Sequence, residues 1–137
     1  MKTLFIFLCL IIALSRCDSD SISPVKLFGK WNPTYQRQIK NDNGSWKPWT
    51  MINTLEAIPQ LEFTAEGKFL TDALPSKDCC YPMGNYSLSR NVITFEAQII
   101  CPNGLCVDCK KWIINSLDSD TLIVESCTSR NKYVRVK

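Results

Sequence analysis

The stretch that decides the fold is Leu27-Phe28-Gly29-Lys30-Trp31. Glycine lets the backbone adopt a conformation that a side chain would forbid. A tryptophan two residues later points to the same face of an extended chain. This combination predicts a first β-strand that enters a barrel at this point, with the indole of Trp31 closing the floor.

Hydrophobic residues after this stretch recur with a period of two, which is typical of strands with one buried face. The alternating sets are Leu61 and Phe63; Ile93, Phe95, Ala97 and Ile99; Leu122 and Val124; and Val134 and Val136. We expect the inward face of the strands to include Leu61, Phe63, Phe69, Tyr86, Leu88, Ile93, Phe95, Leu122 and Val124. The fold class is therefore all-β.

Short and long connections alternate strictly between the predicted strands. The short turns cover 64–67, 89–91 and 118–120, and the longer connections cover 40–59, 73–84, 100–109 and 126–131. Gly, Asn or Asp in each short segment suits a tight hairpin. The pattern predicts an eight-stranded up-and-down antiparallel barrel, with all short turns at one end and all long loops at the other.

Two motifs at the ends of this pattern resemble the lipocalin signature. They are Gly29-Lys30-Trp31 in the first strand and Tyr133-Val134-Arg135 in the last. The hairpin order between them resembles that of small bacterial lipocalin-like lipoproteins. The resemblance implies a lipocalin-like barrel that binds a small apolar or amphipathic ligand without catalysis. We also expect Trp31 and Arg135 to meet at the floor.

The N-terminus predicts export. Lys2 precedes a short apolar run, so residues 1–16 are predicted to be a signal peptide, 17–25 a tether and 26–137 the barrel domain. The segment Leu14-Ser15-Arg16-Cys17 resembles a bacterial lipobox, although Arg16 stands where a small residue is expected. The resemblance implies a lipid on Cys17 and a place at the cell envelope, anchored in a membrane. Plain secretion, with Cys17 free or paired between chains, is the alternative.

The number of cysteines supports a lipid anchor on Cys17. Of eight cysteines, Cys9 lies in the predicted signal peptide, and a lipid on Cys17 leaves six that can pair completely. These six lie in or beside the long loops: Cys79, Cys80, Cys101, Cys106, Cys109 and Cys127. We expect three disulfides at one rim, with adjacent Cys79 and Cys80 bonded to different partners. The alternative is zinc held by Cys79, Cys80, Cys106 and Cys109. The exported context favours the disulfides, so neither a metal nor another cofactor is predicted.

Composition argues against several functions. Of 16 Lys and Arg, Lys2 and Arg16 precede Cys17, which leaves 14 against 13 Asp and Glu, well interspersed. No basic stripe indicates a nucleic acid. Histidine is absent, and the sequence contains neither a G-x-S-x-G motif nor a Gly-rich phosphate loop, so no catalytic residues are predicted. Asp118 and Asp120 are expected to accept bonds from backbone N–H groups in their turn. The protein is expected to be a monomer.

The tryptophans differ in position. Trp31 is predicted to be structural and Trp112 to lie in the core. Trp46 and Trp49 are in the longest loop, at the open rim, where they could contact a ligand or simply pack over the rim.

The alternative function is binding of another protein, such as a secreted enzyme to be inhibited, through the disulfide-braced rim. A cavity of roughly 300 Å³ or more would favour the small ligand, whereas a filled interior would favour the protein partner.

Overall fold

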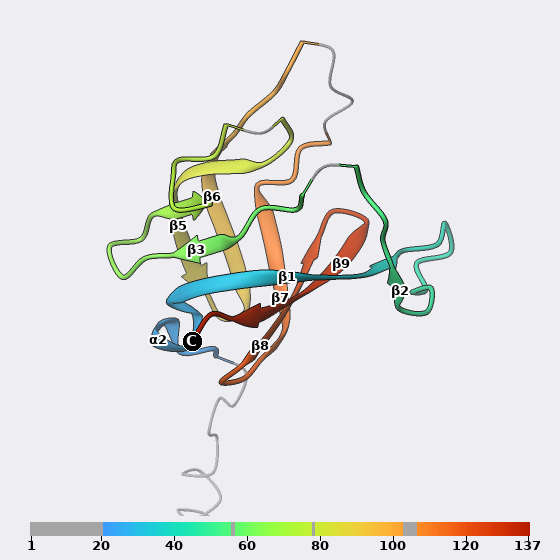
Figure 1. Cartoon of the computed structure of the whole chain (residues 1–137), viewed down its shortest axis with the longest axis horizontal. Helices are drawn as coiled ribbons and strands as arrows, with labels where there is room; N and C mark the ends of the chain where they lie inside the picture. The colour runs from blue at the N-terminus through green and yellow to red at the C-terminus, as the bar shows by residue number, and fades with distance from the viewer. Residues whose placement is uncertain (1–20, 56, 78, 103–106) are drawn as a thin grey trace, which may run out of the picture.

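The computed structural model describes residues 21–55, 57–77, 79–102 and 107–137 of the chain. Within these ranges the chain has one short helix and nine strands, and eight of the strands form an antiparallel barrel (Figure 1). The elements are α2 (Pro24–Leu27), β1 (Gly29–Ile39), β2 (Thr50–Met51), β3 (Leu61–Phe63), β4 (Phe69–Thr71), β5 (Pro82–Ser89), β6 (Val92–Gln98), β7 (Lys111–Leu117), β8 (Thr121–Ser126) and β9 (Ser129–Arg135).

The strand order β4-β3-β1-β9-β8-β7-β6-β5 confirms the predicted eight-stranded, up-and-down, lipocalin-like barrel. The additional strand, β2, lies within the longest predicted loop and pairs with β1. Between β4 and β5 the barrel is nearly closed, by a bridge between Lys68 and Asn85. Beside it, the Tyr86 backbone N–H donates to the Gly67 carbonyl at 2.7 Å.

The entry of β1 has the predicted conformation. Gly29 has a φ of +118°, and a Cβ atom there would lie 3.0 Å from Nη1 of Arg135. Trp31 is fully buried and lies opposite Leu61 of β3 and Arg135 of β9. Its indole N–H donates to the Leu27 carbonyl at 2.9 Å. The backbone conformation at position 29 therefore favours glycine, and an added Cβ would also crowd the guanidinium of Arg135.

Arg135 links several elements at the floor of the barrel. Its guanidinium carbon lies 4.1 Å from the centre of the Trp31 ring, so the two residues meet as expected. The same group donates to the carbonyls of Phe28 at 2.7 Å, Lys26 at 2.5 Å and Ser119 at 2.6 Å. The last carbonyls of a helix have no partner within the helix. Arg135 satisfies carbonyls at the end of α2 and ties that helix to the β7–β8 turn.

The residues just before β1 lie against the barrel. The Ile22 backbone N–H donates to the Arg90 carbonyl at 3.2 Å, and the Ile22 side chain packs against the core. Leu27 of α2 is fully buried. Residues 22–25 were expected to belong to a tether. At least Ile22 instead packs against the core of the barrel.

The half of the barrel interior nearer the floor is filled with side chains. Seven of the nine side chains expected to face inward are buried, and Tyr86 and Leu88 are partly buried against them. Aromatic rings dominate this layer, with centroid distances of 5.2 Å for Phe63–Phe69 and 4.9 Å for Phe69–Phe95. Such tilted pairs fill space closely and leave little room for a ligand here.

The connection between β8 and β9 was predicted wrongly as a long loop over 126–131. It is a two-residue turn of Cys127 and Thr128, because Ser126 and Ser129 already pair as strand residues. Cys127 has a φ of 52°, a left-handed conformation that tight hairpins require. Polar residues extend β8 and β9 here because backbone pairing with neighbouring strands outweighs their low strand propensity.

The buried face of the last strand was also predicted wrongly. Val134 and Val136 are 39% and 36% exposed, whereas Tyr133 is buried. The pairing of Arg135 with the buried Trp31 sets this register. A shift of one residue exchanges the two faces of a strand.

The long connections after β4 and β6 lie together at the end of the barrel opposite α2, at the top of Figure 1. No helix among the described residues is both long and apolar enough to cross a membrane.

Candidate ligand-binding site

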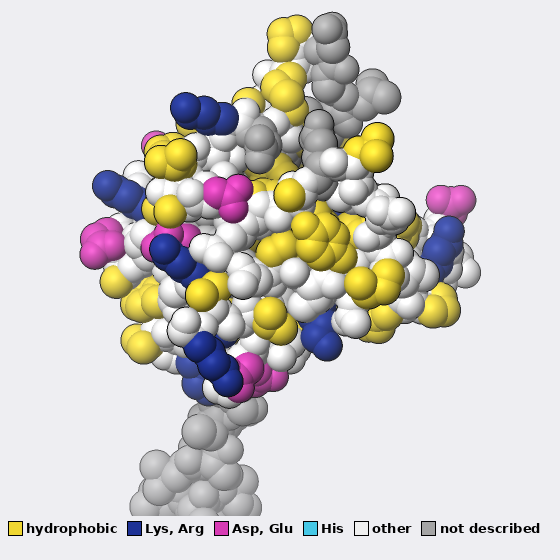
Figure 2. Space-filling view, in the orientation of Figure 1, with side chains coloured by type: hydrophobic (Ala, Val, Ile, Leu, Met, Phe, Trp, Pro, Cys, Tyr) yellow, Lys and Arg dark blue, Asp and Glu magenta, His cyan; other side chains and the backbone are white. Residues whose placement is uncertain are grey.

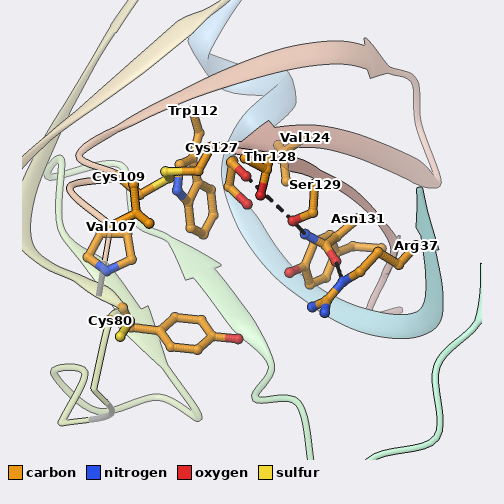
Figure 3. Close-up of a pocket in the computed structure, with 14 residues that line it drawn as sticks. Arg37, Cys80, Val107, Cys109, Trp112, Val124, Cys127, Thr128, Ser129 and Asn131 are labelled. Carbon is orange, nitrogen blue, oxygen red and sulfur yellow. Dashed lines mark hydrogen bonds between the residues drawn. A yellow bond between two sulfur atoms is a disulfide. The ribbon is translucent and has the colours of Figure 1, made fainter. Parts of the chain in front are cut away.

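A cavity of about 280 Å³ lies at the loop end of the barrel (Figure 3), and Trp31 is not among its lining residues. The floor half is packed with aromatic rings, so this end holds the free space. The lining residues come from β1, β5, β7, β8, β9 and the loops: Arg37, Cys80, Tyr81, Pro82, Val107, Cys109, Trp112, Val124, Ser126, Cys127, Thr128, Ser129, Asn131 and Tyr133.

The polar side chains of the lining come from alternate residues of neighbouring strands. Three alternating residues of β9, namely Ser129, Asn131 and Tyr133, line the cavity. Val124 and Ser126 of β8 lie opposite Asn131 and Ser129 and share their face. The interior therefore changes along the strands from apolar near the floor to polar near the loops.

A bulge in β1 adds a positive charge to this face. Pro33 pairs with Tyr133 and Arg37 pairs with Asn131, so β1 takes four steps where β9 takes two. Tyr35, within the bulge, has a φ of 60°. Directly opposite residues share a face, so Arg37 points inward with Asn131.

Hydrogen bonds fix the orientation of Arg37. Its Nε–H donates to Oδ1 of Asn131 at 2.8 Å, and Nδ2 of Asn131 donates to the Ser129 hydroxyl at 3.3 Å. That hydroxyl donates in turn to the Ser126 carbonyl at 3.4 Å. Figure 3 shows these side chains as a continuous row along one wall.

Arg37 is the one charged residue among the lining residues that the structure describes. Within the described part of the chain its guanidinium makes the single bond to Asn131 and no ion pair. The N–H groups of its two terminal nitrogens thus have no protein partner among those residues. An inward-facing cation of this kind is costly unless water or a ligand satisfies it.

Tyr133 lies on the same wall. Burial raises the pKa of its hydroxyl, the nearby Tyr81 raises it further, and the Arg37 guanidinium lowers it. The hydroxyl makes no hydrogen bond to another described residue, and it is not among their fully enclosed unpaired atoms. It can therefore exchange a hydrogen bond with a molecule in the cavity.

The neighbouring part of the lining, next to Ser126 across the β7–β8 pair, is apolar. Trp112 is 5% exposed and is held edge-on by Phe95 and Phe69, at centroid distances of 4.9 and 5.7 Å. Val124 and Pro82 are buried beside the cavity. These contacts keep the indole from turning, so it offers a fixed apolar surface.

Two disulfides brace the loops at this end, Cys79–Cys101 and Cys109–Cys127, and Cys80 is also disulfide-bonded. Cys79 and Cys80 thus have different partners. The Cys109–Cys127 bond forms part of the cavity wall (Figure 3). Such bonds indicate an oxidising compartment outside the cytoplasm. Cys106 and Cys17 lie outside the described residues.

We expect alkaline pH to destabilise the protein through its tyrosines. Burial, with a contribution from Glu66, raises the pKa of Tyr86 to about 12, and the pKa of Tyr133 is raised too. Since the folded state holds these protons more tightly, their contribution is complete below pH 10 and is lost as the pH rises through the folded-state values. Denaturant unfolding at pH 8 and pH 11 should show this loss, and Tyr133→Phe should make it smaller. An equal loss in the variant would contradict the assignment.

Trp46 packs on the outside of the barrel. Its ring lies 4.0 Å from the Arg130 guanidinium carbon and 5.1 Å from Lys40 Nζ, and both cations lie 3.3 Å from Glu125. Arg130 alternates with the inward Ser129 and Asn131, so this cluster is on the outer face. Trp49, just before β2, is 39% exposed. The residues that line the cavity include neither tryptophan.

Several acidic and sulfur groups that the sequence singled out have other partners in the structure. Among the described residues no cluster of three His, Cys, Asp or Glu could hold a metal. Three of the four thiols in the zinc alternative, those of Cys79, Cys80 and Cys109, are disulfide-bonded. Asp118 accepts from the backbone of Asp120 and Thr121 at 2.9 and 2.7 Å, as its turn position predicts, and these bonds lower its pKa.

Sequence analysis missed most of the lining. Ser129, Asn131 and Tyr133 alternate and could have been recognised as one strand face, but 126–131 was predicted to be a loop. Trp112 was predicted to be core, and it is both core and cavity wall. No local signal identifies Arg37, because its direction depends on the bulge opposite β9.

Fold and cavity together define a nearly closed, lipocalin-like antiparallel barrel with a partly open interior at its loop end. No family model matches the chain. No curated protein matches it either. Among solved structures it is similar to a lipocalin-like protein from Bacteroides uniformis, with 16% sequence identity and a TM-score of 0.38. That alignment covers 81% of this chain and 99% of the other. The barrel assignment itself rests on strand order and register.

Proposed function

We propose that this protein binds a compact amphipathic small molecule, non-covalently, in the cavity at the loop end of the barrel. The supporting observation is a hollow of about 280 Å³ whose lining combines apolar side chains with a row of polar ones. Binding sites for small molecules typically measure roughly 300–1,000 Å³ and combine apolar walls with a few placed polar groups. The cavity, at about 280 Å³, lies just below this range, so the ligand is small.

A binding role without catalysis agrees with the chemistry of the lining. Its titratable groups, apart from Arg37, are the two tyrosines, and its cysteines Cys80, Cys109 and Cys127 are disulfide-bonded. Among the described lining residues there is no nucleophile paired with a base, the arrangement that covalent catalysis needs.

Tryptophan fluorescence tests the proposal directly. We expect ligands that enter the cavity to change the emission of wild-type protein, because Trp112 forms its apolar wall. Trp112→Phe should abolish that change, whereas Trp49→Phe should retain it. A panel of small aromatic and short-chain amphipaths should be titrated, with affinity measured independently by calorimetry. If no member of the panel binds, the proposal is wrong.

A second candidate, binding of a protein partner at the rim, is favoured by exposed apolar side chains on the long connections. The exposed residues there are Met51, Leu55, Leu74, Ile100 and Val107. Figure 2 shows apolar side chains among the loops at the upper end of the molecule. The same titration separates the two candidates, because binding at the outer rim requires no occupancy of the interior and no response from Trp112.

We further propose that the protein is exported and anchored through Cys17. The described chain enters the barrel at the floor, where α2 and Arg135 lie. A lipid on Cys17 would therefore hold the floor at the membrane and direct the cavity away from it. Wild-type protein should fractionate with membranes and become soluble on Cys17→Ser. Soluble wild-type protein would indicate plain secretion.

A further inference from the structure

We infer that the ligand carries a carboxylate, which pairs with the guanidinium of Arg37 while the apolar body of the ligand lies against Trp112. This inference rests on the proposed function and adds the chemical class of the ligand. It assigns Arg37 as the residue that determines specificity.

The position of Arg37 carries the inference. A charged side chain faces the inside of a barrel, near the buried Val124 and Tyr133, without a counter-ion among the described residues. Two other arginines have protein partners: Arg130 binds Glu125, and Arg135 binds three carbonyls. For stability alone, a neutral residue at position 37 would avoid the cost of desolvating a charge.

The hydrogen bonds of Arg37 leave its terminal nitrogens for a ligand. Asn131 accepts from Nε and is itself held by Ser129, so the guanidinium plane is fixed in advance. Its two terminal N–H pairs suit the two oxygens of a carboxylate, which accepts such forks with good geometry. The Tyr133 hydroxyl, on the same face, provides one further donor.

Charge balance favours a carboxylate over a phosphate ester. Among the described residues of the lining, Arg37 is the single charged group, and it neutralises one negative charge. A phosphate monoester carries close to two at neutral pH. Its second charge would remain uncompensated in a half-buried site, which is unfavourable.

The test compares three probes that share one ring system: 2-naphthoate, the neutral 2-naphthalenemethanol, and 2-naphthyl phosphate. Calorimetry should be performed on full-length wild-type protein, Arg37→Gln and Arg37→Lys. Lys26→Gln is the matched control, because it removes one positive charge from an exposed position of α2 at the opposite end. Thermal unfolding of each variant verifies that the fold is retained.

We expect wild-type protein to bind the naphthoate at least about tenfold more tightly than the alcohol and the phosphate, as charge-assisted hydrogen bonds are the stronger kind. Arg37→Gln should remove this preference while leaving the affinity for the alcohol within about twofold. Arg37→Lys should keep part of it, and Lys26→Gln should keep all of it. Should Arg37→Gln fail to fold, the Arg37→Lys variant and the ranking of probes on wild-type protein decide the outcome.

Two results would overturn the inference while leaving the proposed function intact. One is equal binding of naphthoate and alcohol by wild-type protein, and the other is a carboxylate preference that survives in Arg37→Gln. Phosphate binding as tight as naphthoate binding would overturn the carboxylate assignment. If none of the probes binds, and the wider panel also fails, the proposed function itself fails.

Discussion

Trp31→Ala should lower the free energy of unfolding by about 3–5 kcal/mol, the usual cost of removing a buried tryptophan. The indole is fully buried at the floor, where it meets Leu61 across the strands. Its loss leaves a cavity, takes away the ring beneath Arg135, and leaves the Leu27 carbonyl without its donor. Equilibrium denaturation measured by circular dichroism gives the change.

Two further variants test the reason for this cost. Trp31→Phe keeps most of the volume but loses the N–H, so its effect should be smaller than that of alanine. Trp49→Ala removes an indole that is 39% exposed and should alter stability by no more than about 0.5 kcal/mol. A Trp31→Ala variant as stable as wild type would mean that Trp31 does not hold the floor together.

Replacing both Cys109 and Cys127 with serine should cost about 3 kcal/mol and should also weaken ligand binding. The bond closes a segment with a sequence separation of 18, and crosslinks of that length stabilise by about this amount. Both residues line the cavity, so their separation also loosens its wall. Denaturation and the naphthoate titration measure the two effects.

The bond between Cys79 and Cys101 provides the matched control. It spans a similar separation of 22, but neither residue lines the cavity. Its removal should cost a similar free energy of unfolding while changing affinity by less than about twofold. Equal losses of affinity in the two double variants would show that loop stiffness in general, rather than the Cys109–Cys127 wall, maintains the site.

Local sequence patterns were sufficient to predict the class of fold. Alternation in stretches such as Leu61–Phe63 and Ile93–Phe95 predicts strands with a buried face, and tight turns such as 118–120 predict which strands are neighbours. These signals are local because a strand of period two and a turn of three or four residues are set by nearby side chains. Gly29 and Trp31 likewise predicted the floor, and Arg135 was expected beside it.

Register and closure depended on contacts between distant segments. The alternation of valines at 134 and 136 predicted the wrong face of β9, because the pairing of Arg135 with Trp31 overrides it. The length of the β8–β9 connection was missed for a related reason. Ser126 and Ser129 are poor strand formers in isolation and become strand residues because their backbones pair with each other.

The cavity was decided by tertiary structure alone. Arg37 faces inward because β1 bulges against β9, which no local pattern around Arg37 specifies. The pairing of six cysteines has many possible connectivities, and the fold selects among them by bringing Cys109 beside Cys127. The sequence by itself thus determined an all-β barrel with a tryptophan floor and a cysteine-rich rim. Only the packing of distant strands decided where its interior stays open and which charge faces that space, because register and bulges depend on both strands of a pair.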